Sequence, residues 1–170
     1  MRPAVAAIAG LCAVAVLGGA WAAMAGMRAE PALSAPLATW DPADPDLGRK
    51  AYAMCLGCHG ADGRGVPGYA PGLAGSPWLA GDARAAVLMV LHGYDATSEP
   101  GAAYHSSRML GHGHQLADHE LAGLLTWARR QWGHGAEPVE RAMVTALRRR
   151  HAGRATPWSP AELRAILAGP

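Results

Sequence analysis

The chain of 170 residues contains no phenylalanine and only three cysteines, and its charged residues amount to 16 %. So few cysteines argue against a disulfide framework, which uses more of them in small domains. A chain of this length forms about one domain with extensions, and without phenylalanine its core needs another source of apolar bulk. Glycine and proline are abundant instead, at 22 and 13 residues. This composition predicts a loop-rich domain rather than a dense helical bundle.

The N-terminal segment carries no charge apart from Arg2, since residues 3–27 read PAVAAIAGLCAVAVLGGAWAAMAGM. Two interpretations of residues 1–27 stay open. A signal peptide explains the basic start, the apolar stretch and an A-x-A cleavage site at Ala23–Ala25. A membrane anchor explains the total length, because about 20 apolar residues span a bilayer. Both interpretations place the rest of the chain outside the cytoplasm, in the periplasm or on the outer face of the cytoplasmic membrane, with residues 28–45 as a linker.

The two cysteines beyond this segment lie in MCLGCHGADGRG, where Cys55, Cys58 and His59 form a C-x-x-C-H motif. A structural zinc site needs four ligands, and no second C-x-x-C or His pair with the usual spacing follows closely. A thioredoxin-like redox pair needs a βαβ setting, which the flanking sequence does not offer. A plain disulfide leaves His59 without a role. One covalently attached haem c uses all three residues, with both thiols bonded to the vinyl groups and His59 as the proximal iron ligand.

The helix signals place this motif at the end of a helix, DPDLGRKAYAMCLGCHG, which begins at Asp46 and stops at Gly60. The loop that follows, GADGRGVPGYAPGLAGSPWLAGD, is so rich in glycine and proline that it can wrap closely around a flat cofactor. The haem then supplies the apolar mass that phenylalanine would otherwise give. We expect an all-α fold with long loops, and further helical patterns cover residues 83–92, 118–132, 139–151 and 160–168.

Four motifs together resemble a class I (monohaem) cytochrome c domain over residues 46–134: the C-x-x-C-H cluster, the PGL turn at Pro71, the methionine loop SSRML and the closing helix LADHELAGLLTWARRQWG. Within that superfamily, LAGSPWLAGD, LHGY, TWARRQWG and TPWSPAEL are similar to haem domains that accompany periplasmic or membrane-bound dehydrogenases, quinoprotein ones included. The resemblance implies a class I cytochrome c-like fold around one covalent haem. Residues 135–170 would then form a basic helical C-terminal extension.

The resemblance implies Met109 as the sixth ligand of the haem iron. The residues agree, because Met109 is the methionine that lies in a polar loop, where a thioether otherwise has little reason to be. Leu110 stands where the family usually has the proline that keeps the ligand's backbone extended. An alternative therefore stays open, in which a second imidazole replaces the thioether and lowers the reduction potential. The histidines of the same loop that could do so are His105, His112 and His114.

The resemblance also implies residues that support the haem. Pro71 matches the proline whose carbonyl accepts the ring N–H of the proximal imidazole, which fixes the tautomer of that ligand. Gly48 and Tyr52 match the face of the first helix that packs on the last helix of the domain. We expect Leu124 and Trp127 to meet them there.

The charges are distributed unevenly. Six basic and ten acidic residues lie between Arg28 and Trp127, whereas eight basic and three acidic residues follow. A basic helix of this kind suits an acidic protein partner or anionic lipid heads, or is a solvated face. Export and a covalent haem argue against nucleic acid as the partner. The arginines on or just after the predicted helix are Arg141, Arg148, Arg149, Arg150 and Arg154.

These features predict an exported monohaem c-type cytochrome that transfers single electrons and is not itself an enzyme. Its redox partners would be a periplasmic dehydrogenase as donor and a cytochrome or oxidase of a respiratory chain as acceptor. One alternative is a haem subunit that acts as an internal relay and docking element of a larger complex. Another is a haem enzyme with peroxidase-like activity, which requires that Met109 leaves the iron open.

Overall fold

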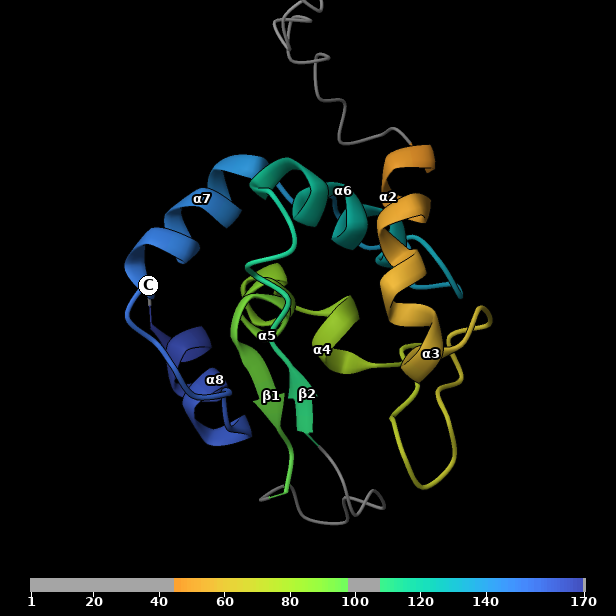
Figure 1. Ribbon diagram of the computed structural model, residues 1–170, viewed down its shortest axis with the longest axis horizontal. Coiled ribbons are helices and arrows are strands. Elements are labelled where there is room, and N and C mark those ends of the chain that lie inside the picture. The colour runs from red at the N-terminus through yellow and green to blue at the C-terminus, as the bar shows by residue number, and fades with distance from the viewer. Residues whose placement is uncertain (1–44, 98–107, 170) are drawn as a thin grey trace, which may run out of the picture. The chain divides into compact units, whose positions relative to one another are not determined.

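The computed structural model describes residues 45–97 and 108–169. This part of the chain is mostly helical and contains one small two-stranded sheet (Figure 1). The predicted class, helices joined by long loops, is confirmed. The sheet is a feature that sequence reasoning did not predict. The predicted signal peptide or anchor at residues 1–27, the linker that follows it and His105 lie outside the described residues.

The C-x-x-C-H motif ends a segment made of three consecutive helical elements. These are α2 (Pro45–Tyr52), a single 3-10 turn η1 (Ala53–Cys55) and α3 (Leu56–His59). Asp46 lies in the first turn, where a carboxylate favours the helix N-terminus. Gly60 ends the segment with a φ of +71°, a conformation that suits glycine. The predicted helix from Asp46 to Gly60 is confirmed, with a tighter turn around the first cysteine.

The last helix of the family-like region, α6 (Asp118–Ala128), packs across α2. The two backbones come very close at Gly48, where a Cβ would lie only 2.3 Å from the Cβ of Trp127. The ring of Tyr52 lies beside that indole, with 4.8 Å between the ring centroids. Leu124 is buried in the same hydrophobic cluster. The helix contact predicted from Gly48, Tyr52, Leu124 and Trp127 is therefore present.

Helix α6 ends four residues before the predicted boundary at residue 132. The chain leaves the helix after Ala128 and turns back, and Trp132 takes a positive φ of +53°. Its indole packs against the rings of Tyr52 and Trp127, with centroid distances of 5.8 Å and 6.1 Å. Burial of this third ring explains the early end, because a continuing helix would carry residue 132 away from the other two.

Helix α5 (Ala83–His92) lies at the centre of the core and follows the short α4 (Pro77–Ala80). Its N-cap is Asp82, whose carboxylate accepts a hydrogen bond from the backbone N–H of Arg84 at 2.8 Å. Most of its residues are buried, and α4, α6, α7 and α8 all contact it. The prediction of a helix over residues 83–92 is confirmed at both ends.

The two strands of the sheet are β1 (Gly93–Asp95), which follows α5 directly, and β2 (Arg108–Leu110). They are antiparallel, and Tyr94 is opposite Met109. Each strand has three residues, which is too short for the alternating pattern that reveals strands in a sequence. This explains why they were not predicted.

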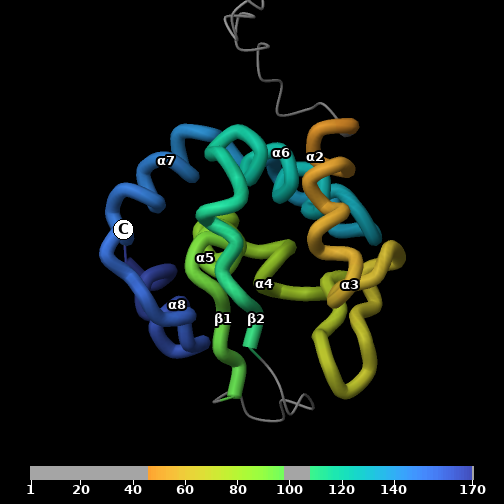
Figure 2. The backbone as a smooth tube through the Cα atoms, in the orientation of Figure 1, coloured from red at the N-terminus to blue at the C-terminus, as the bar shows by residue number. Residues whose placement is uncertain are grey.

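The C-terminal extension contains α7 (Arg141–Arg150) and α8 (Pro160–Ala168). Figure 2 shows this last part of the chain, in blue, passing beside α5 and β1. Val144 and Leu163 are fully buried, so the helices share the core of the preceding domain rather than standing apart. Both helices were predicted, α8 with the same bounds. Among the described residues, no helix is long and apolar enough to span a membrane.

Candidate functional site

A cavity that is open to solvent lies between the C-x-x-C-H segment, the α4–α5 region, β2 and α6. Three of the predicted site residues, Cys55, His59 and Met109, line it together although His59 and Met109 are far apart in the sequence. Concave, apolar sites with a few convergent polar groups are typical of ligand and cofactor binding. The remaining wall is largely aliphatic and includes Leu73, Leu79, Ala86, Val90, Leu124 and Leu125.

His59 is buried, and its Nδ1 lies 3.0 Å from the carbonyl oxygen of Pro71. Because a carbonyl only accepts hydrogen bonds, Nδ1 is the donor and carries the proton. The other ring nitrogen, Nε2, is therefore left with a free lone pair, as a metal ligand needs. Burial lowers the pKa of His59, which favours the neutral ligating form, although the bond to Pro71 acts in the opposite direction. The predicted contact between Pro71 and His59 is present.

The loop that carries Pro71 is folded back on the motif by short backbone contacts. The N–H of Gly65 donates to the carbonyl of His59 at 3.0 Å, and the N–H of Leu73 donates to that of Gly63 at 2.7 Å. Gly65 has a φ of +74°, and a Cβ there would lie 2.4 Å from the carbonyl oxygen of Ala70. The glycine-rich composition is therefore what lets the loop close against His59.

Cys55 and Cys58 are both free thiols and form no disulfide. They are three residues apart at the end of a helical segment, so their side chains project from neighbouring positions on one face. Burial, with a further contribution from Cys58, raises the pKa of Cys55 to about 11. Before the haem is attached, the thiol of Cys55 is thus protonated at neutral pH. The plain-disulfide interpretation of the motif is not supported.

Met109 reaches the cavity from β2, where it is half-buried and packs against the main hydrophobic cluster. His112 and His114 follow on the same loop, but neither lines the cavity. His114 is exposed, and Nδ1 of His112 lies 3.1 Å from Oε1 of Gln115. His112 does lie near enough to His59 to contribute to the lowering of its pKa. Of Met109, His112 and His114, it is therefore Met109 whose side chain lines the cavity.

Two further residues support the wall of the cavity and were missed by sequence reasoning. Arg129 is buried and donates to three carbonyls, those of Leu79, Gly81 and Glu137. His134 Nε2 lies 2.9 Å from the carbonyl oxygen of Leu73. These contacts join residues about 50 and 60 positions apart in the chain. No local pattern could have revealed them.

Comparison with known proteins agrees with this geometry. The family model for cytochrome c matches residues 45–132, about half of the chain. The chain belongs to the cytochrome c family. Cytochrome c-552 of Thermus thermophilus is 36 % identical over 90 residues, which are 51 % of this chain and 68 % of that protein. A second cytochrome c-552, from a strain of the same species, is also 36 % identical over 90 residues. The match covers 51 % of this chain and 60 % of that protein. Both relatives are cytochromes c, in agreement with the resemblance.

Family membership makes covalently attached haem c, with its iron, the cofactor of this chain, and Cys55 and Cys58 fit the C-x-x-C-H motif. The structure offers what such a group requires. Cys55 lines the cavity and Cys58 follows three residues later on the same segment. The buried imidazole of His59 presents an unprotonated nitrogen, and the rest of the lining is largely aliphatic. A thioether enters the same cavity from a different element. The donor set and the apolar lining therefore fit haem c.

Proposed function

We propose that the chain carries single electrons outside the cytoplasm, from a periplasmic dehydrogenase to a cytochrome or oxidase of a respiratory chain. Electron transfer by a c-type cytochrome follows from the family and the cytochrome c-552 relatives. The compartment is supported by the uncharged segment after Arg2, which has the composition of an export signal. The donor is supported by the similarity of LAGSPWLAGD, TWARRQWG and TPWSPAEL to haem domains that accompany dehydrogenases.

We further propose that His59 Nε2 and Met109 Sδ would ligate the haem iron, and that Cys55 and Cys58 would be the attachment sites. The observation that carries this assignment is that Cys55, His59 and Met109 line one apolar cavity while Pro71 fixes the His59 tautomer. Haem c, when bound, supplies an iron that alternates between the ferrous and ferric states.

The residues of the chain then have distinct tasks. His59 and Met109 would both ligate the haem iron, which would leave no position for a substrate, so that the site would only pass electrons. The aliphatic side chains, Leu124 and Leu125 among them, exclude water and keep the surroundings apolar. The Pro71 carbonyl strengthens His59 as a ligand by accepting its Nδ1 proton in a hydrogen bond. A methionine rather than a second histidine raises the reduction potential.

The test is the absorption spectrum of the ferric and ferrous holoprotein, recorded for the unchanged chain and for Met109→Ala. We expect a far-red sulfur-to-iron band in the ferric protein and its loss in Met109→Ala. The matched control is His112→Ala, on the same loop, which should keep the band. A low-spin spectrum without the band would point to a histidine ligand and a low-potential relay. A high-spin spectrum would contradict the carrier function and favour the peroxidase-like alternative.

The alternative function, a haem subunit that relays electrons inside a larger complex, depends on a docking surface. The basic surface on α7 is smaller than the sequence predicted. Arg148 and Arg154 are held by hydrogen bonds within the chain. Arg141, Arg149 and Arg150 are exposed on α7 and remain for an acidic partner or anionic lipid heads. Purification from native membranes distinguishes the two functions, because a relay subunit elutes with its complex and a free carrier elutes alone.

A further inference from the structure

The strand that presents Met109 belongs to a wider backbone arrangement. Tyr94 in β1 is opposite Met109 on one side and forms a parallel bridge with Trp158 on the other. The N–H of Asp95 donates to the Trp158 carbonyl at 2.8 Å, and the N–H of Trp158 donates to the Gly93 carbonyl at 3.0 Å. Figure 1 shows β1 between β2 and the segment that leads into α8. The C-terminal extension therefore pairs, through the single bridge at Trp158, with the edge of β1 that faces away from β2.

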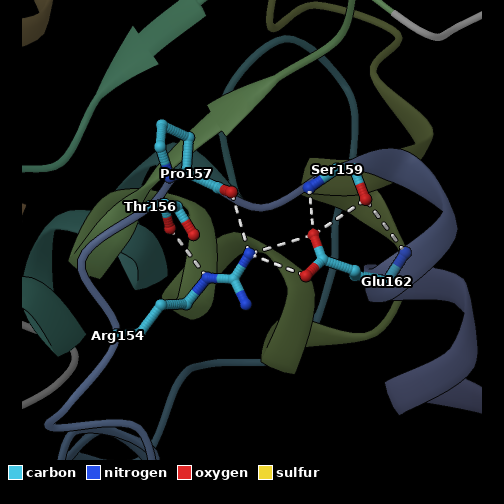
Figure 3. Close-up of polar contacts among 5 residues, drawn as sticks. All are labelled: Arg154, Thr156, Pro157, Ser159 and Glu162. Atoms are coloured by element: carbon cyan, nitrogen blue, oxygen red, sulfur yellow. Dashed lines mark hydrogen bonds and ion pairs between the residues drawn. The ribbon is translucent and has the colours of Figure 1, made fainter.

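The segment around Trp158 is held firmly. Its indole is buried, and the Arg154 guanidinium lies 3.4 Å above the ring. Arg154 donates to both carboxylate oxygens of Glu162 at 2.9 Å and to the carbonyls of Thr156 and Pro157 at 2.8 Å (Figure 3). Nη2 of Arg154 makes the contacts with Glu162 and Pro157, and Nε donates to Thr156, so three residues hold the guanidinium in place.

The packing of Trp158 also reaches the cavity. Its side chain belongs to a buried cluster with Leu88, Met89 and Leu163. Met89 also lines the cavity that contains Met109. Trp158 is thus connected to the Met109 site by its backbone through β1 and by its side chain through α5.

A second contact from the extension holds the chain just after Met109. Arg148 on α7 donates to the carbonyls of Gly113 and Leu116, the latter at 2.8 Å, and to Asp118 Oδ1 at 2.7 Å. These acceptors span the segment between β2 and α6. The side chain of Arg148 is 32 % exposed and that of Asp118 is 21 % exposed, so the contact is partly shielded from water. Arg148 therefore joins two points of the loop and the first residue of α6 to α7.

Such support adds to the contacts that the methionine loop makes itself, chiefly the Arg108–Asp95 ion pair across the two strands. It matters because one restraint is missing from the loop. Leu110 replaces the proline that would limit the backbone of Met109, and its side chain is 75 % exposed. A ribbon of two strands is marginally stable by itself. The extension adds support to this ribbon, through two backbone hydrogen bonds at Trp158 and the hydrogen bonds of Arg148.

We infer that the C-terminal extension holds Met109 at the iron, with Arg148 and the Arg154–Trp158 pair as positioning residues. The inference rests on the proposed function, in which Met109 is the sixth ligand. It gives residues 135–169 a role in ligation that goes beyond their contribution to the core.

The test measures how easily added imidazole displaces Met109 from the iron of the ferric holoprotein. The loss of the far-red band reports the displacement. In Arg148→Gln, the imidazole concentration at half-loss should fall by about tenfold, because several charge-assisted hydrogen bonds are removed. Arg148→Lys, which keeps the charge but not the three-point contact, should show an intermediate fall. Arg154→Gln should show a fall as well. The matched control is Arg149→Gln, an exposed neighbour on α7, which should leave the concentration unchanged.

Urea unfolding of the same variants separates ligation from general stability. If Arg148→Gln and Arg154→Gln remain folded and lower only the unfolding midpoint, with imidazole displacement unchanged, the inference is overturned and the proposed function stands. If the unchanged chain lacks the far-red band, the proposed function and the inference both fail. If the band is present, is lost in Met109→Ala and is displaced more easily in the arginine variants, both are supported.

Discussion

The backbone of Gly48 lies directly against Trp127: a Cβ on residue 48 would fall 2.3 Å from the Cβ of Trp127 and 2.5 Å from the carbonyl oxygen of Gly123. Helix α2 leads into the C-x-x-C-H motif, and α6 contributes Leu124 and Leu125 to the cavity wall. The distance between these helices therefore sets the width of the site at one end. Only glycine allows them to come this close.

Gly48→Ala should force α2 and α6 apart and lower the free energy of unfolding by about 1–3 kcal/mol, the usual cost of overpacking a core. Denaturant unfolding of the holoprotein measures this change in the free energy of unfolding. Gly153→Ala is the matched control, since a Cβ at that exposed position meets nothing within 4 Å. The control should stay within about 0.5 kcal/mol of the unchanged chain. Equal effects of the two substitutions would contradict the account of the helix crossing.

Much of the site could be predicted because its signals are local. Cys55, Cys58 and His59 are close in sequence, so their spacing alone indicates the chemistry. The pairing of Pro71 with His59 followed from the family resemblance and is present as a hydrogen bond. Long helices such as α5 carry periodic apolar residues, which explains why its bounds were predicted.

The parts that could not be predicted depend on contacts between distant residues. The pairing of Tyr94 with Met109 involves strands of three residues, which show no period. Arg148 was counted as part of a basic surface, because nothing in its neighbourhood shows that Gly113 and Leu116 provide acceptors for it. Arg129 was missed for the same reason. Tertiary hydrogen bonds of arginine leave no trace in local sequence.

Gly93 is required by the strand that carries Met109, for two separable reasons. Its φ is +90°, and a Cβ would lie 2.5 Å from the carbonyl oxygen of Met109. Gly93→Ala should therefore lower stability and weaken the far-red band. Gly133→Ala separates the two effects, because Gly133 has a similar φ of +84° but open space around it. Gly133→Ala should lower the free energy of unfolding by about 1–2 kcal/mol through the backbone conformation alone, and it should leave the far-red band unchanged. Loss of the band in Gly133→Ala would show that the effect is not specific to the β1–β2 contact.

Replacing Arg129 should lower the free energy of unfolding more than replacing an exposed arginine. Its guanidinium is buried and satisfies the carbonyls of Leu79, Gly81 and Glu137, while burial lowers its pKa. Arg129→Met leaves these acceptors without their charged donor and should cost about 1.5–3 kcal/mol in urea unfolding. The adjacent Arg130 is exposed, so Arg130→Met is the control and should have little effect. A similar loss in both variants would indicate that charge, rather than the buried hydrogen bonds, matters.

Stability should also fall in mild acid because of His92. Its ring packs against those of His151 and Trp158, and its Nε2 is buried without a hydrogen-bond partner in the part of the chain that the structure describes. Burial lowers the pKa of His92 below the ordinary value of 6.5, and the nearby charges of His151, Arg154 and Arg148 lower it further, although a backbone contact with Arg154 opposes them.

The folded state therefore takes up a proton on His92 less readily than the unfolded state. The free energy of unfolding should decrease as the pH is lowered through about 6.5, the value of an unperturbed histidine, until the folded protein is protonated as well. His92→Gln cannot titrate and should show a smaller decrease between about pH 7 and pH 5 in urea unfolding. The exposed His114 provides the control, His114→Gln, which should follow the unchanged chain. If His92→Gln retains the full decrease, the acid sensitivity arises elsewhere, and His151, whose pKa burial also lowers, is the next residue to replace.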